Sequence, residues 1–136
     1  MNTRQLVAIA GLALLPAAGL LSAHHAFSSE FDANRPVLLR GKVTKTEWVN
    51  PHSWIHIEVK SADGSTASWA IECGAPNSLL RRGLNKTSIP PGSDIVIDGY
   101  QAKDGSTTAN AREITLPDGQ RFQVGSTGTG APYEKK

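Results

Sequence analysis

Alternation of apolar and polar residues is the feature of this sequence that most constrains its fold. Between Ser53 and Lys60, every second position is a branched apolar residue, so Ile55, Ile57 and Val59 share one side. A repeat of two residues is that of a β-strand with one buried face. Comparable patterns predict further strands near residues 37–49, 66–73, 94–101 and 109–116, and residues 121–124 add a short extension.

Turn residues and one helical segment predict how these strands are connected. Asp63-Gly64 marks a tight hairpin turn between two of them. One helix is expected from Pro76 to Arg82, because proline suits a first helical turn and Gly83 suits the end. This order favours an all-β fold: a five-stranded Greek-key barrel of the oligonucleotide/oligosaccharide-binding type at residues 37–124, with the helix between strands three and four. A small open sandwich is the alternative.

The same alternation predicts which residues fill the barrel. They are Val37, Leu39, Val43, Ile55, Ile57, Val59, Trp69, Ile71, Leu79, Leu80, Ile95, Ile97 and Ile114. A set of this size fills a small barrel and leaves no room for a large enclosed ligand, so binding is expected on the surface. Cys73 continues the inward alternation and is expected to be buried and inert.

Residues 1–23 predict a secretory signal peptide. Arg4 precedes an apolar stretch from Leu6 to Leu21, and the small residues Ser22 and Ala23 follow it. The apolar stretch contains Pro16 and is shorter than the roughly 20 residues of a membrane-spanning helix. We therefore expect removal of this segment, export to the periplasm or the extracellular space, and no membrane anchor in the mature chain.

The segments on either side of the predicted barrel have no sustained periodicity. Residues 24–36 are expected to form an N-terminal arm, with Phe27 and Phe31 as anchors. Residues 125–136 are rich in Gly, Ser and Thr and are expected to form a disordered tail. The domain itself is therefore expected to lie between these two flanks.

Charge and motif content exclude several classes of function. The chain has a formal net charge of +2, and loss of Arg4 with the signal peptide brings it closer to zero, so no nucleic-acid partner is expected. The single cysteine, Cys73, forms no internal disulfide. Nucleophile-elbow, phosphate-loop and dinucleotide-binding motifs are absent from the sequence. We therefore predict a binding or accessory module rather than an enzyme.

Several longer motifs resemble those of a known family. They are AHHAF at 23–27, FD at 31–32, GKVT at 41–44, WVNPHSW at 48–54, PNSLLRRG at 76–83 and GYQAKDG at 99–105. Together they resemble a family of small exported bacterial proteins described as a domain of unknown function. The resemblance implies export and assigns no activity, and the fold it implies is similar to small periplasmic barrel proteins.

Histidines at the predicted new N-terminus suggest a metal site. Cleavage after Ala23 makes His24 the terminal residue, whose α-amino group and ring can chelate one ion. Cleavage after Ser22 instead places His24 and His25 second and third, where the amine, two backbone nitrogens and a ring form a square-planar set. Either arrangement favours copper as Cu(II), then Ni(II). The alternative is an exposed polar arm without a ligand.

The other two histidines, His52 and His56, lie around the start of the second predicted strand. Four residues of straight strand separate them by about 13 Å, so they share one ion only if His52 folds back within its turn. Otherwise each could complete a site with the N-terminal arm, where Glu30 and Asp32 supply carboxylates. The alternative is that both histidines are ordinary turn and strand residues.

Two tryptophans at the same turn suggest a competing function. Trp48 and Trp54 lie on either side of Asn50, and such a pair can form a platform for a protein or glycan partner. The alternative is that at least one of them belongs to the core. A metal-free interaction module at this turn is therefore the second hypothesis.

Overall fold

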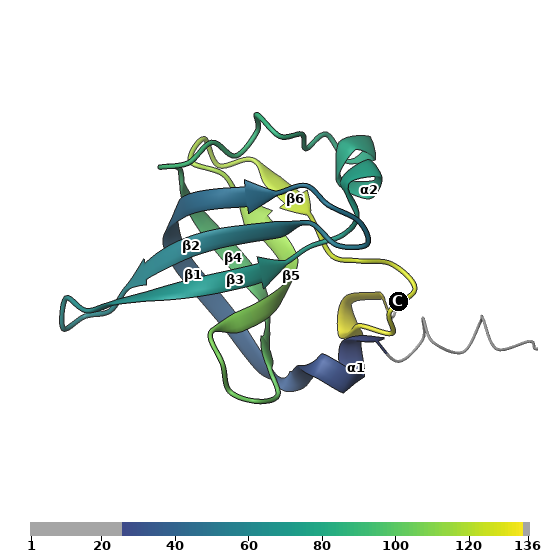
Figure 1. Cartoon of the computed structure of the whole chain (residues 1–136), viewed down its shortest axis with the longest axis horizontal. Coiled ribbons are helices and arrows are strands. Elements are labelled where there is room, and N and C mark those ends of the chain that lie inside the picture. Colours follow the sequence, from purple (N-terminus) through teal and green to yellow (C-terminus); the bar gives the residue numbers. More distant parts are fainter. Residues whose placement is uncertain (1–25, 135–136) are drawn as a thin grey trace, which may run out of the picture.

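The computed structural model describes residues 26–134 and shows a small β-rich domain (Figure 1). No helix in this range is long and apolar enough to cross a membrane. The strands are β1 (Phe31–Glu47), β2 (Trp54–Lys60), β3 (Thr66–Glu72), β4 (Asp94–Ala102), β5 (Thr108–Thr115) and β6 (Arg121–Gln123). The helices are α1 (Ala26–Glu30), α2 (Pro76–Arg81) and the short 3-10 helix η1 (Pro132–Glu134).

The strands form one sheet that closes on itself. Their order is β3-β2-β1-β4-β5-β6, and β3 also pairs with β5. The β3–β5 pairing is parallel, with Ile71 opposite Ala109, and the other pairings are antiparallel. This ring of strands, with α2 between β3 and β4, confirms the predicted all-β barrel-like fold and not the open sandwich. The short β6 extends the edge beyond the five strands predicted for the barrel.

Two glycines allow the sheet to curve tightly. A Cβ atom on Gly41 of β1 would lie 2.8 Å from the backbone oxygen of Glu58 on β2. One on Gly99 of β4 would lie 2.2 Å from the backbone oxygen of Asn110 on β5, where the strand register shifts. No side chain fits either gap. Glycine therefore permits the close strand contacts that closure requires, as expected for a bent strand.

The core is largely the predicted one. Val43, Ile55, Ile57, Ile71, Leu79, Ile95, Ile97 and Ile114 are buried, and Val37, Leu39, Val59 and Trp69 pack partly buried against them. Cys73 is fully buried, as expected. Leu80 was predicted to face inward but is 60% exposed, because in the short helix α2 only Leu79 turns towards the barrel. Leu84 and Ile89, from the segment between α2 and β4, cover the core in its place.

Both flanks of the barrel differ from the sequence expectation. The predicted arm, residues 24–36, includes α1 and the first residues of β1, whereas the part before Ala26 lies outside the described residues. The predicted disordered tail is packed on the domain as far as Glu134: Ala131 is buried, and Tyr133 packs against Phe27. Apolar residues in the two flanks bury one another, which a composition rich in Gly and Ser does not reveal.

Phe27 and Phe31 act as the predicted anchors. Both are buried in a second apolar cluster with Ala102 and Ala131, against which Tyr100 and Tyr133 pack. The backbone N–H of Phe27 donates to the carbonyl oxygen of Thr129, 3.3 Å away. Helix α1 and the C-terminal segment therefore lie side by side at one end of the barrel (Figure 1).

Candidate functional site

His52 lies at the end of the barrel where the two flanking segments meet. It follows the cis peptide bond between Asn50 and Pro51, in the connection from β1 to β2. The next residue, Ser53, exchanges backbone hydrogen bonds with the chain after β3: its N–H donates to Gly74, and its carbonyl accepts from Cys73. These bonds hold the loop of His52 against the end of β3.

A buried polar network surrounds this histidine. We call it the Glu72 cluster; its members are His52, Glu72, Asn110, Ser126 and Tyr133. Glu72, the last residue of β3, is 7% exposed and Asn110 of β5 is 1% exposed. The Asn110 side-chain amide donates to Glu72 Oε1 at 3.1 Å, and the Tyr133 hydroxyl donates to Asn110 Oδ1 at 2.9 Å. Three segments that are distant in sequence thus orient one carboxylate.

Burial controls the protonation of this network. It raises the pKa of Glu72 above its ordinary value, although His52 and the Asn110 hydrogen bond oppose the shift. Glu30 of α1 repels Glu72 and adds to the rise in pKa. Burial also raises the pKa of Tyr133 to about 12, so this hydroxyl stays a hydrogen-bond donor. The cluster therefore holds a carboxylate whose ionised form is disfavoured by burial and is not neutralised by a close cation.

The nearest basic group to this carboxylate is His52, whose Nδ1 lies 3.9 Å from Glu72 Oε1. Its hydrogen bond is instead with Ser126, at 3.1 Å between Nδ1 and Oγ. The Ser126 hydroxyl is 3.5 Å from the Cys73 carbonyl, to which it donates, so it accepts from His52. This assigns the proton of a neutral His52 to Nδ1. Nε2, which has no hydrogen-bond partner within residues 26–134, then carries a lone pair.

A surface cavity adjoins His52. It has a volume of about 270 Å³, and Pro51, Ala75, Ser126 and Thr129 are among its lining residues. The carbonyl of Thr129 is the acceptor of the Phe27 N–H. The N-terminal segment therefore joins the domain at the wall of the cavity that contains His52.

His56 has a different environment on the outer face of β2. Its Nε2 is hydrogen-bonded to Glu47 Oε2 at 2.6 Å, and Lys45 Nζ lies 3.5 Å from the other oxygen of the same carboxylate. The hydrogen bond from His56 lowers the pKa of Glu47. Among the residues that the structure describes, His52 and His56 share no hydrogen-bond partner. Across residues 26–134, no three His, Cys, Asp or Glu side chains are grouped so that they could hold a metal ion.

The structure places some of the remaining predicted site residues and leaves others undescribed. His24 and His25 lie outside the described residues. Trp48 is half-buried against the core, and its indole N–H donates to Thr46 Oγ1 at 3.1 Å. Trp54 is half-buried on β2, and Asn50 is exposed. Asp32, in the irregular first part of β1, accepts from the backbone N–H of Asn34. The Trp48–Trp54 platform and the carboxylate role of Asp32 stay predictions.

Sequence reasoning missed four members of the Glu72 cluster, namely Glu72, Asn110, Ser126 and Tyr133. Glu72 lies between the inward residues Ile71 and Cys73, so the alternation places it outside the barrel, and there the flanking segments cover it. Ser126 and Tyr133 belong to the stretch whose composition predicted disorder. The signal that was present is Asn110 itself, a polar residue between Ala109 and Ala111 of β5.

Comparisons with known proteins give one match. No curated protein and no solved structure matches the chain. Residues 13–111 match a family model described as "Family of unknown function (DUF6152)". This confirms the resemblance to an uncharacterised domain, and the match covers most of the chain and four of the five strands predicted for the barrel. The protein belongs to this family of unknown function.

Proposed function

We propose that the protein is an exported binding or accessory module, periplasmic or extracellular, that holds one Cu(II) or another late divalent metal ion. The ligands are His52 and the histidines that precede the described residues, His24 and His25. The Glu72 carboxylate lies beside His52 and compensates the charge of the ion. Export rests on the sequence of residues 1–23, and the metal site rests on the arrangement around His52.

The observation that carries the proposal is the hydrogen bond from Phe27 to Thr129 at the wall of the His52 cavity. His25 is two residues before Phe27, so two peptide bonds keep its Cα within roughly 8 Å of the Phe27 Cα. Chain connectivity therefore limits how far His25 can be from Thr129, a residue that lines the His52 cavity. His56, in contrast, already has a carboxylate partner in Glu47.

The chemistry of the residues fits a late divalent metal. A metal-binding histidine ordinarily donates its second ring N–H to an oxygen, as His52 does to Ser126, and offers the other nitrogen to the ion. A terminal His24 adds its amine and ring, or an Ala23-His24-His25 terminus adds a square-planar nitrogen set. Nitrogen-rich sets of this kind bind Cu(II) most strongly in the affinity series of divalent ions. A buried carboxylate short of positive charge gains from the ion nearby.

The proposal is tested by copper binding to protein purified from the exported fraction. Native mass spectrometry gives the N-terminus and the metal content together, and we expect loss of the first 22 or 23 residues and about one copper per chain. His52→Ala and the double change of His24 and His25 to Ala should each lower copper affinity more than about tenfold. His56→Ala is the matched control and should bind as wild type.

Two results would contradict the proposal. Copper binding unaltered by the change of both N-terminal histidines would exclude them as ligands. Equal losses in His52→Ala and His56→Ala would show that neither histidine is specifically involved. Circular dichroism and thermal unfolding of each variant separate loss of a ligand from loss of the fold.

A further inference from the structure

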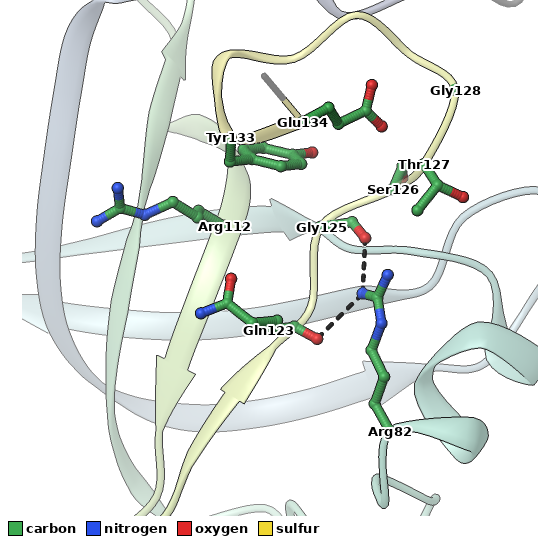
Figure 2. A pocket seen from close by; sticks show the side chains of 9 residues that line it. All are labelled: Arg82, Arg112, Gln123, Gly125, Ser126, Thr127, Gly128, Tyr133 and Glu134. Carbon is green, nitrogen blue, oxygen red and sulfur yellow. Dashed lines mark hydrogen bonds between the residues drawn. The ribbon is translucent and has the colours of Figure 1, made fainter. Parts of the chain in front are cut away.

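A second cavity lies next to that of His52, along the C-terminal segment. Its volume is about 410 Å³, and Figure 2 shows Arg82, Thr127 and Tyr133 around it. Residues 126–128 line both this cavity and that of His52. The two cavities therefore share one wall, whereas no histidine lines the second. We call it the Arg82 cavity.

The guanidinium group of Arg82 is fixed in place by the backbone. Nη1 donates to the carbonyl oxygens of Gln123, at 3.0 Å, and Gly125, at 2.8 Å (Figure 2). Both bonds use the same nitrogen. Nε and Nη2, which form the opposite edge of the planar group, have no hydrogen-bond partner within residues 26–134. That edge presents two parallel N–H donors, the geometry that matches the two oxygens of a carboxylate or phosphate.

The charge of Arg82 is not compensated by the described residues. None of their carboxylates lies within ion-pair distance of it. The other arginine of the cavity, Arg112, is paired with Asp98. The cavity's carboxylate, Glu134, accepts from the backbone N–H of Gly130 at 2.9 Å and points away from Arg82 in Figure 2. Arg82 is therefore a half-buried cation that lines the cavity and has a pair of donors without a partner among the described residues.

We propose that the Arg82 cavity binds a small organic oxyanion, a carboxylate or a phosphate. The Nε–Nη2 edge of Arg82 holds the anionic group, and the Thr127 hydroxyl, on the exposed rim, supplies a further donor. The ring of Tyr133 forms an apolar wall for the body of the ligand. The volume falls within the range of small-molecule sites, about 300–1,000 Å³, and exceeds what an inorganic anion needs.

The experiment is an NMR titration of ¹⁵N-labelled protein kept free of metal with a chelator. Benzoate and phenyl phosphate are the two anionic probes, and benzamide is the neutral probe of similar shape. We expect saturable shifts of the amides of residues 123–128 with benzoate, phenyl phosphate or both, and none with benzamide. Which anion binds more tightly distinguishes a carboxylate ligand from a phosphate ligand.

Variants of the two adjacent arginines make the test specific. Arg82→Gln should weaken binding on the order of tenfold to a hundredfold, the loss expected of a hydrogen bond to a charged group. Arg81→Gln, the matched control, removes an exposed arginine that contacts Ser78 outside the cavity and should bind as wild type. If Arg82→Gln loses the native spectrum, Arg82→Lys takes its place in the titration. Lysine keeps the charge and lacks the paired donors, so this variant should also bind the anion more weakly than wild type.

The proposal fails if neither anion gives saturable shifts, or if benzamide binds as tightly as the anions. It also fails if the Arg82 variant that stays folded binds as tightly as wild type. Because the titration is carried out without metal, its result does not depend on the copper site. If the protein does not bind copper, the anion site can still be present. If the protein does not bind the anions, the copper site can still be present.

Discussion

His52 and His56 are four residues apart, yet the first lies near a buried carboxylate and the second near an exposed one. His56 is on the outer face of β2, with its Nε2 bonded to the exposed Glu47 carboxylate. His52 lies at the barrel end, bonded to Ser126 and close to the buried Glu72. The surface carboxylate of Glu47 pairs with Nε2 of the first histidine. The second stands beside a carboxylate whose burial leaves it short of positive charge.

The difference between the two histidines comes from which parts of the chain surround them. The neighbours of His56 are on β1 and β3, strands next to its own, and local pairing places them. The neighbours of His52 come from the end of β3, from β5 and from the segment after β6. The barrel end is assembled from the two flanks of the domain, so its stability and its chemistry depend on how these flanks pack.

The largest predicted effect is that of Phe27→Ala, which removes the main contact between the flanks. Phe27 is 4% exposed, and its ring centroid lies 5.7 Å from that of Phe31, 5.5 Å from Tyr100 and 6.5 Å from Tyr133. Truncation of a buried phenylalanine should lower the free energy of unfolding by about 3 kcal/mol. Copper affinity should fall too, although no ligand is removed. Chemical denaturation and calorimetric titration measure the two effects.

Leu80→Ala is the control for this change. Leu80 is 60% exposed on α2, so its truncation should alter the free energy of unfolding by less than about 0.5 kcal/mol. Equal stability of the Phe27 and Leu80 variants would show that the flanks do not hold the barrel end. The environment of His52 would then not depend on the packing of the two flanks.

The same division explains how much the sequence could predict. Alternation along β2 gave the inward set Ile55, Ile57 and Val59 and the outward position of His56, because both depend only on the repeat of a strand. The alternation could not show that Glu72 is buried, because the residues that cover its side chain come from outside the barrel strands. Nor could composition distinguish a disordered tail from one in which Ala131 and Tyr133 pack.

The next largest effect is that of Glu72→Gln, which should change stability and copper affinity in opposite directions. The glutamine oxygen still accepts from Asn110, and the buried charge is gone. At neutral pH, the metal-free variant should be more stable than wild type, on the order of 1 kcal/mol. Its copper affinity should be lower, because the charge of the ion is no longer compensated. Thermal unfolding and calorimetric titration of the same sample test both directions.

The sign of the stability change follows from the raised pKa of Glu72. Between the pKa of the unfolded chain, about 4.3, and the higher pKa in the fold, the folded state binds more protons. Wild-type stability therefore falls as pH rises through this window, and the glutamine variant escapes the fall. The difference should vanish below about pH 4. Glu58→Gln, on the exposed side of β2, should show no such gain, and a matching gain there would rule out burial as the cause.

The smallest predicted effect is that of Glu47→Gln, on the side of His56, and its sign should be the reverse. The hydrogen bond from His56 lowers the pKa of Glu47 in the folded state. The ionised carboxylate therefore stabilises the fold above the pKa of the unfolded chain, and this stabilisation is lost as pH falls through the lower pKa of the folded state. Solvent screens so exposed a pair, and the drop in unfolding temperature at neutral pH should be slight. Copper affinity should not change. A rise in unfolding temperature would mean that Glu47 is destabilising in the fold, as Glu72 is. Weaker copper binding would mean that His56 belongs to the metal site.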